Sequence, residues 1–434
     1  MKISLINHGC AKNLVDAELL LGILDKNGYK ITLDESEADI VIVNTCSFIH
    51  DAEKESVQSI LQMIDSGKKV IVTGCLSQKH NEDLKSAIPE ISGMIGTSNL
   101  TDITKIIEKI KQDKYESIIS KEPKYIYPED VKRQQITMGA SSYLKIGEGC
   151  NYKCGYCVIP NLRGKYVSRP IENIVKEAKE LVSKGVTEII LIAQDTSSYG
   201  LDLYKKQALP QLLEELNKIE NLSWIRIMYA YPTMMTDELI DAMARLEKVV
   251  KYVDIPLQHS HPRVLESMKR PVMDYRELIQ KIKDKIPNVS IRTSLVVGYP
   301  GETEEEFEHL YNFVKEVKFD RMGAFEYSKE KNTYSYSLKG HIPAKIKKQR
   351  RNKLMELQQK ISLENNKNRI GSTLKCIVEG YTDDGVIILR TEYDAPEIDG
   401  VVYATSDNPV VPGDIEDVRI TRADEYDLFG EIVE

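Results

Sequence analysis

The sequence lacks any long hydrophobic run. No stretch of about 18 apolar residues is present, as a membrane-spanning helix would require. The N-terminus also lacks the apolar segment and small-residue cleavage site of a signal peptide. Internal repeats and low-complexity tracts are absent, which excludes repeat architectures. We therefore expect a cytoplasmic globular protein with no membrane partner.

The chain also has no net positive charge, and its number of cysteines is odd. The formal net charge of −8 gives no support to broad binding of nucleic acid, although such a sum can hide a local basic patch. Seven cysteines without an export signal argue against a disulfide framework, because reduced thiols more often serve metals or catalysis. A length of 434 residues suggests about three domains.

Alternating apolar runs and helical patterns predict an α/β fold in three parts. Residues 1–120 read as an open, doubly wound parallel sheet, with strands at 3–6, 39–45 and 69–74. Residues 121–136 are charged and without periodicity, so they read as a linker. About six βα units over 136–368 suit a partial (β/α) barrel with its site at the carboxyl ends of the strands. Five short strands over 370–434 suggest a small all-β barrel of the oligonucleotide-binding type.

Cys150, Cys154 and Cys157 form a C-x3-C-x2-C loop directly after the first strand of the predicted barrel. Three thiolates on one loop can bind three irons of a cubane cluster and leave the fourth iron open. A zinc knuckle or chance clustering is the alternative, but structural zinc sites want four ligands and no partner pair follows. The spacing and position resemble the radical S-adenosylmethionine (SAM) superfamily. That resemblance implies that Tyr156, Gly298 and Glu302 lie near SAM, although the GYPG stretch at 298–301 is also simply a good turn.

Cys10, Cys46 and Cys75 each stand a few residues after one of the three predicted parallel strands. Loops that follow parallel strands gather along one edge of the sheet, so these thiols should converge on a common crevice. They could then bind a second cluster. Three unrelated buried cysteines are the alternative, since free cysteine is among the most buried residue types. Cys376 lies inside an apolar run and is expected to pack in the core.

The joint pattern is similar to the methylthiotransferase family of radical SAM enzymes, over essentially the whole chain. The matching stretches are GCAKNLVDAE (9–18), NTCSF (44–48), TGCLSQ (73–78), the three-cysteine loop, RGKYVSRPIE (163–172), AQDTSSYG (193–200), PLQHS (256–260) and RTSLVVGYPGET (292–303). The resemblance implies an N-terminal methylthiotransferase domain with an auxiliary cluster, a radical SAM domain and a C-terminal TRAM domain. The implied cofactors are two 4Fe-4S clusters and S-adenosyl-L-methionine, with an electron donor as partner.

Within the family, GCAKNLVD and the AQDT stretch resemble the branch that modifies an aspartate of small-subunit ribosomal protein twelve. The tRNA-modifying branch, MiaB, typically has GCQMN at the first position. Residues 370–434 contain sixteen acidic and four basic residues, a net charge of −12 against −8 for the whole chain. Such a module would repel RNA and attract a basic ribosomal protein, although an acidic surface can also be merely solubilising.

The family implies that one SAM methylates a sulfur held on the auxiliary cluster and a second yields the radical that removes hydrogen from the aspartate β-carbon. Methylthiolation of tRNA adenosine and a non-catalytic cluster-carrying scaffold are the rival functions. Four polar residues near strand ends could orient SAM or the aspartate, with structural ion pairing as the alternative; they are Asp195, Arg226, His259 and Arg292.

Overall fold

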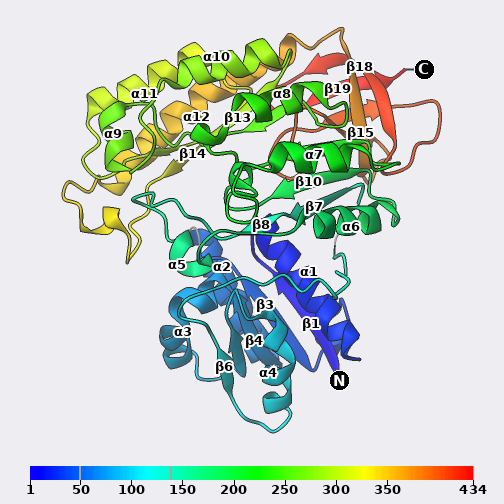
Figure 1. The fold of residues 1–434 in the computed structure, drawn as a ribbon, viewed down its shortest axis with the longest axis vertical. Coiled ribbons are helices and arrows are strands. Elements are labelled where there is room, and N and C mark those ends of the chain that lie inside the picture. Colours follow the sequence, from blue (N-terminus) through cyan, green and yellow to red (C-terminus); the bar gives the residue numbers. More distant parts are fainter. Residues whose placement is uncertain (48–49, 137–138, 434) are drawn as a thin grey trace. The chain divides into compact units, whose positions relative to one another are not determined.

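The computed structural model describes residues 1–47, 50–136 and 139–433 (Figure 1). It contains two compact units, formed by Met1–Met138, Gly147–Tyr152 and Val158–Arg169 in the first and Gly139–Ile146, Lys153–Cys157 and Pro170–Glu434 in the second. The three-cysteine loop is therefore divided, with Cys150 in the first unit and its other two cysteines in the second. Phe48 of the predicted NTCSF motif and the acidic Glu434 lie outside the described residues.

A six-stranded parallel sheet forms the first unit, in the order β2-β1-β3-β4-β5-β6. Its strands are β1 (Lys2–Asn7), β2 (Lys30–Ile31), β3 (Ile40–Thr45), β4 (Lys69–Gly74), β5 (Gly93–Ile95) and β6 (Glu116–Ile118). Its larger helices are α1 (Ala11–Lys26), α2 (His50–Asp65), α3 (Cys75–Ala87) and α4 (Ile103–Ile110), with turns η1 (Glu35–Glu37) and η2 (Leu100–Asp102). The three strands that the sequence predicts are the central ones, and the additional strands are only two or three residues long.

Both faces of this sheet are covered. Alternate side chains of β3 enter two separate cores, because successive strand residues point to opposite faces. Ile40 and Ile42 pack with residues of α1 and α4, whereas Val41 and Val43 pack with residues of α2 and α3. The predicted doubly wound sheet is confirmed.

The predicted linker at 121–136 forms no helix or strand, but it is packed onto the first unit. Tyr125 is buried in the core of the sheet, and Arg133 forms a buried ion pair with Glu18 of α1 at 3.1 Å. The backbone N–H of Ile136 donates to Oε1 of Glu18 at 3.0 Å. Single buried residues in an aperiodic segment leave no pattern in the sequence, so this packing was not predicted.

The second unit begins with two three-stranded parallel sheets, ordered β11-β10-β7 and β12-β13-β14 and linked by a bridge between Ile225 and Val249. The strands are β7 (Ser141–Lys145), β10 (Glu188–Ile192), β11 (Trp224–Ile227), β12 (Tyr252–Asp254), β13 (Ser290–Val297) and β14 (Arg321–Glu326). The helices are α6 (Ile171–Val182), α7 (Leu209–Asn217), α8 (Asp237–Arg245), α9 (Pro262–Ser267), α10 (Tyr275–Lys285), α11 (Glu304–Val317) and α12 (Ala344–Lys367), with turns η3 (Thr196–Ser198), η4 (Pro232–Met234) and η5 (Tyr334–Ser337). This is the predicted partial (β/α) barrel.

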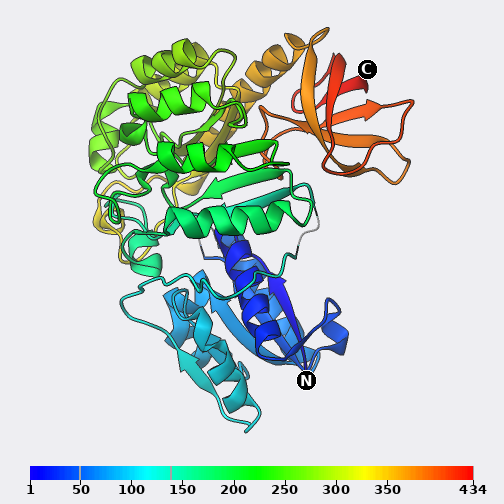
Figure 2. The ribbon, with the colours of Figure 1, turned by 45° about the vertical axis from the view of Figure 1, so that its right-hand side comes forward.

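Helix α12 leads into a closed five-stranded barrel, ordered β15-β16-β17-β19-β18 (Figure 2). Its strands are β15 (Thr373–Tyr381), β16 (Ile387–Thr391), β17 (Val402–Thr405), β18 (Ile415–Ala423) and β19 (Leu428–Ile432). Cys376 is fully buried in the apolar interior with Val378 and Leu389, as predicted. The small all-β barrel is confirmed.

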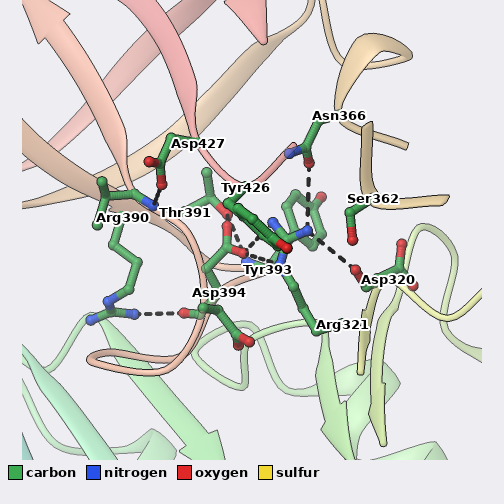
Figure 3. Close-up of polar contacts among 12 residues, drawn as sticks. Asp320, Arg321, Ser362, Asn366, Arg390, Thr391, Tyr393, Asp394, Tyr426 and Asp427 are labelled. Carbon is green, nitrogen blue, oxygen red and sulfur yellow. Dashed lines mark hydrogen bonds and ion pairs between the residues drawn. The ribbon is translucent and has the colours of Figure 1, made fainter. Parts of the chain in front are cut away.

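Buried ion pairs attach this C-terminal barrel to the strands of the βα barrel (Figure 3). Arg321 Nε donates to Asp394 Oδ1 at 2.8 Å, and Arg390 donates to the Asp394 carbonyl at 2.9 Å. Arg390 also pairs with Glu188, which accepts from Arg226 Nε at 2.8 Å. Glu188 and Arg321 are the first residues of β10 and β14. The C-terminal barrel thus contacts the amino ends of the strands, opposite the carboxyl ends where sites of such barrels are built.

Candidate functional site

The structure brings the backbones of Cys10, Cys46 and Cys75 to one edge of the first sheet. The three cysteines follow β1, β3 and β4, which are neighbours in the sheet. The register pairs Asn7 with Asn44 and Thr45 with Gly74, so the carboxyl ends of these strands are aligned. The predicted convergence in space of cysteines that are far apart in sequence follows from this topology.

A buried asparagine holds these loops together. Asn13 Nδ2 donates to the carbonyl of Thr45 at 2.9 Å, and Asn44 Nδ2 donates to the carbonyl of Asn13 at 2.7 Å. Gly74, at φ +94°, allows the backbone before Cys75 to lie close to Thr45, since a Cβ there would stand 2.4 Å from the Thr45 carbonyl oxygen. The loop of Cys46 therefore depends on a side chain three residues beyond Cys10, and its close approach to the loop of Cys75 depends on a glycine.

Two of these cysteines occupy helix N-termini. Cys10 is the N-cap residue of α1, and Cys75 is the first residue of α3. Free backbone N–H groups and the helix dipole favour a thiolate there. Desolvation raises the pKa of Cys10, but Lys12, the Asn13 N–H and Arg163 outweigh it, so the pKa lies below its usual value. Burial keeps the pKa of Cys75 above its usual value despite the opposing charge of Arg163.

Arg163 was not singled out by the sequence reasoning, although it opens the quoted RGKYVSRPIE stretch. It ends helix α5 (Ile159–Arg163), and its guanidinium is buried. Nη1 donates to Asp16 Oδ2 at 2.6 Å, and Nη2 lies 3.5 Å from Cys75 Sγ. Burial opposes the charge, but Glu148, Cys75 and Asp16 outweigh it and hold the pKa of Arg163 well above its usual value. No local spacing signals such a contact, because the partners lie 88 to 147 residues away in the chain.

The three-cysteine loop is anchored separately in each unit. In the first unit, the Cys150 N–H donates to the Gly164 carbonyl at 3.1 Å. In the second, the Cys157 N–H donates to the Cys154 carbonyl at 3.1 Å, which closes a turn. Gly155 is held from both sides, since its N–H donates to Met268 O and its carbonyl accepts from Ser335 N, each at 2.7 Å.

Tyr156 and Arg270 surround Cys154. Tyr156 is half-buried and packs with Met268 and Tyr299. Burial raises its pKa well above the usual value, against the opposing charge of Arg270. Arg270 is buried, with Nη1 3.9 Å from Cys154 Sγ. A cation and a phenol therefore border a sulfur of this loop.

Gly298 and Glu302 form a turn after β13. Gly298 has φ +74°, and a Cβ there would stand 2.1 Å from Lys347 Cγ, so any other residue would be strained. Glu302 Oε2 accepts from the N–H groups of Gly298 and Tyr299 at 2.5 and 3.1 Å, while Oε1 accepts from Arg350 at 2.9 Å. Burial raises the pKa of Glu302 to about 7, with Arg350 opposing. Both carboxylate oxygens stabilise the turn and α12, and a role beside adenosine stays a prediction.

Two of the four polar candidates near strand ends form structural ion pairs. Arg226 pairs with Glu188, as described above, and Arg292 Nε lies 3.3 Å from Asp399 Oδ1 of the C-terminal barrel. Asp195 is the N-cap of η3 and accepts from Ser197 N at 3.0 Å. His259 is buried, its Nδ1 accepts from the His261 N–H at 3.0 Å, and burial lowers its pKa to about 3.

The chemistry of the cysteine loops is compatible with iron–sulfur clusters. Across residues 1–47, 50–136 and 139–433, no group of three or more histidine, cysteine and carboxylate side chains is arranged to hold a metal ion. In a cubane each thiolate binds a different iron, so the sulfurs need not surround a single point. Thiols that only converge on one edge of a sheet can therefore bind such a cluster. The lowered pKa of Cys10 favours the thiolate that a cluster requires, whereas at Cys75 the cation only partly offsets the effect of burial.

Three segments of the chain match known families. Residues 2–96 match the uncharacterized protein family UPF0004, residues 144–314 the Radical SAM superfamily, and residues 370–433 the TRAM domain. The fold and these matches define the class of protein: it is a radical SAM enzyme with a TRAM domain.

Full-length relatives specify the family. The ribosomal protein uS12 methylthiotransferase RimO of Caldanaerobacter subterraneus subsp. tengcongensis is 49% identical, over 99% of both chains. The RimO of Clostridioides difficile is 45% identical, over 100% of this chain and 99% of its own. The chain belongs to the RimO family of ribosomal protein uS12 methylthiotransferases. The predicted protein-modifying branch is thereby confirmed over the MiaB branch.

Solved structures of more distant proteins share the fold. TsrM from Kitasatospora setae, a radical SAM methyltransferase solved with cobalamin and a [4Fe-4S] cluster, has a TM-score of 0.57 at 14% identity, covering 75% of this chain and 72% of its own. The cobalamin-dependent radical enzyme OxsB has a TM-score of 0.51 at 11% identity, covering 83% and 56%. At such identities the likeness shows the fold alone. Among the described residues, no helix is long and apolar enough to cross a bilayer.

Proposed function

We propose that this chain transfers a methylthio group to the β-carbon of an aspartate of ribosomal protein uS12. Membership of the RimO family carries the proposal, since relatives 45% and 49% identical over the full chain are named ribosomal protein uS12 methylthiotransferases. The family uses two 4Fe-4S clusters and S-adenosyl-L-methionine. When bound, these groups supply the electron, the 5′-deoxyadenosyl radical and the methylated sulfur. The protein must hold them, place the aspartate and exclude water.

Six cysteines hold the clusters in this proposal. Cys10, Cys46 and Cys75 bind the auxiliary cluster, and Cys150, Cys154 and Cys157 bind the cluster that cleaves SAM. Tyr156, Gly298 and Glu302 lie near SAM, with Glu302 and Gly298 acting by shaping the turn that approaches it. The turn's own hydrogen bonds support this positioning role.

Contacts within the first unit join the Cys75 loop to the segment that follows the three-cysteine loop. Cys75 packs in one apolar cluster with Val158 and Leu162, and Val158 directly follows Cys157 in the chain. The Arg163–Gly164 turn contacts both sets, because Arg163 reaches Cys75 while the Gly164 carbonyl accepts from the Cys150 N–H.

The acidic C-terminal barrel is the proposed contact for the basic substrate. The negative charge that could attract the substrate is smaller than the sequence implies, because Asp394 and Asp399 form ion pairs with Arg321 and Arg292 of the βα barrel. Among the described residues of this barrel six acidic residues are exposed, namely Asp383, Asp384, Glu397, Asp407, Asp417 and Glu431, and two of them, Asp417 and Glu431, pair with Lys375 and Arg419. An exposed acidic surface repels RNA phosphate and attracts a basic protein.

The domain bounds, the redox partner and the location of the enzyme belong to the same proposal. The domains span residues 1–120, 136–368 and 370–434. An electron donor supplies each reductive cleavage, and the enzyme acts in the cytoplasm, where its ribosomal substrate is made. tRNA is not a substrate.

The test is anaerobic reconstitution followed by separate incubations with uS12 and with tRNA, in the presence of SAM and reductant. We expect a methylthio mass gain on one aspartate of uS12 and formation of 5′-deoxyadenosine. A mass gain on RNA alone would favour the MiaB activity, and no 5′-deoxyadenosine at all would favour a non-catalytic scaffold. Iron analysis adds a check, because two cubanes require about eight irons per chain.

A further inference from the structure

A buried cation directly faces one sulfur of the proposed auxiliary site. Arg163 Nη2 lies 3.5 Å from Cys75 Sγ, within the range of an N–H···S hydrogen bond, and its side chain is 2% exposed. Helix α5 is fixed in this position, since Thr97 Oγ1 donates to the Leu162 carbonyl at 2.6 Å. In such a site water screens the charge only weakly, so its effect on the sulfur is large.

The two ends of the guanidinium have different partners. Nη1 faces carboxylates, with Asp16 Oδ2 at 2.6 Å and Glu148 Oε1 at 3.5 Å. Nη2 faces Cys75 and also donates to Asn13 Oδ1. The carboxylates orient the arginine and partly offset its charge, while the other end is presented to the sulfur. The local field at Cys75 is therefore set by the balance between Arg163 and its carboxylate partners.

We propose that Arg163 is a positioning residue that raises the reduction potential of the auxiliary cluster by donating a hydrogen bond and positive charge to the Cys75 thiolate. The inference rests on the proposed function, which assigns this cluster to Cys10, Cys46 and Cys75. Reduction adds negative charge to a cluster, and donors to its sulfurs stabilise that charge. Asp16 limits the effect, so its removal strengthens the field of Arg163.

The test is a redox titration of the auxiliary cluster, followed by electron paramagnetic resonance. It uses the full-length chain with Cys150, Cys154 and Cys157 replaced by alanine, so that one cluster remains. Arg163→Gln should lower the midpoint potential and Asp16→Asn should raise it. Each should change the ratio of reduced to oxidised cluster at least about tenfold at fixed potential, which is 59 mV for a one-electron couple. A merely structural role would not shift the potential in opposite directions.

Arg133→Gln is the matched control, because Arg133 is a buried arginine of the same unit that pairs with Glu18 at 3.1 Å. It should leave the potential unchanged. If Arg163→Gln fails to retain the cluster, Arg163→Lys and Asp16→Asn decide the question, since the lysine keeps the charge and should shift the potential less than tenfold. Unchanged potentials in the Arg163 and Asp16 variants, with the cluster bound, would overturn the role of Arg163 alone. A background chain that binds no iron would overturn the auxiliary site and the proposed function with it.

Discussion

Glu188 offers the sharpest test of how the C-terminal barrel is attached. It is fully buried at the start of β10 and accepts from two arginines that are themselves buried, Arg226 on β11 and Arg390 on β16. Ser141 Oγ donates to its second oxygen at 2.6 Å. Substitution Glu188→Gln preserves the shape but removes the negative charge between two guanidinium groups.

The expected loss of unfolding free energy can be worked out in two ways. Removing one partner of a buried ion pair typically costs about 3–5 kcal/mol, because the remaining charge is left uncompensated. Burial alone would raise the pKa of Glu188, but Arg390 and Arg226 outweigh it and lower the pKa to about 2 from 4.5. At ~1.4 kcal/mol per pKa unit this shift corresponds to ~3 kcal/mol. We therefore expect Glu188→Gln to reduce the free energy of unfolding of the second unit by about 3–5 kcal/mol at pH 7.

The assay is urea unfolding followed by tryptophan fluorescence. Trp224, the only tryptophan in the sequence, pairs in register with Glu188, so its emission reports on this part of the molecule. Because the pKa of Glu188 is depressed, its contribution is present above pH 4.5 and is lost as the pH falls toward 2. The difference between the two proteins should thus persist from pH 6 to 8 and shrink below pH 4.5.

An exposed ion pair of the C-terminal barrel provides the control. Arg419 Nη2 lies 3.2 Å from Glu431 Oε2, and both side chains are about half exposed. Glu431→Gln should cost less than about 1 kcal/mol. Equal, small losses in both variants would refute the argument that burial makes the Glu188 network essential.

Three further outcomes are expected. Replacing Cys10, Cys46 and Cys75 together by alanine should reduce bound iron from about eight to about four per chain. It should also abolish methylthiolation, while 5′-deoxyadenosine still forms. Iron analysis and product assays check this, and about eight irons per chain would contradict it. Gly298→Ala should cost roughly 1–3 kcal/mol, measured by thermal unfolding, because its φ of +74° disfavours a side chain and its Cβ would clash with a lysine stem 2.1 Å away. The pKa of Glu302 is raised to about 7 from 4.5, so between these pH values the folded state binds a proton that the unfolded state has lost. The free energy of unfolding should therefore decline as the pH rises from 4.5 to 7. Urea titrations of Glu302→Gln should lose that decline, and an unchanged pH dependence would contradict the raised pKa.

Local patterns in the sequence were enough to predict the α/β class, the position of the principal strands and the places of the six loop cysteines. These features are local, because strand and helix periodicities and ligand spacings extend over a few residues. Even the convergence of Cys10, Cys46 and Cys75 follows from a local fact, since each cysteine comes directly after a strand of one parallel sheet.

Tertiary structure alone decided which charged side chains act together. Arg163 meets Asp16 and Cys75 across 147 and 88 residues, and Arg390 meets Glu188 across 202. Such pairs are made when distant segments pack, and a desolvated charge is stable only where its counter-charge arrives. A single sequence carries no periodic signal for that encounter, so the arginine beside the cysteine and the attachment of the acidic barrel became visible only in the fold.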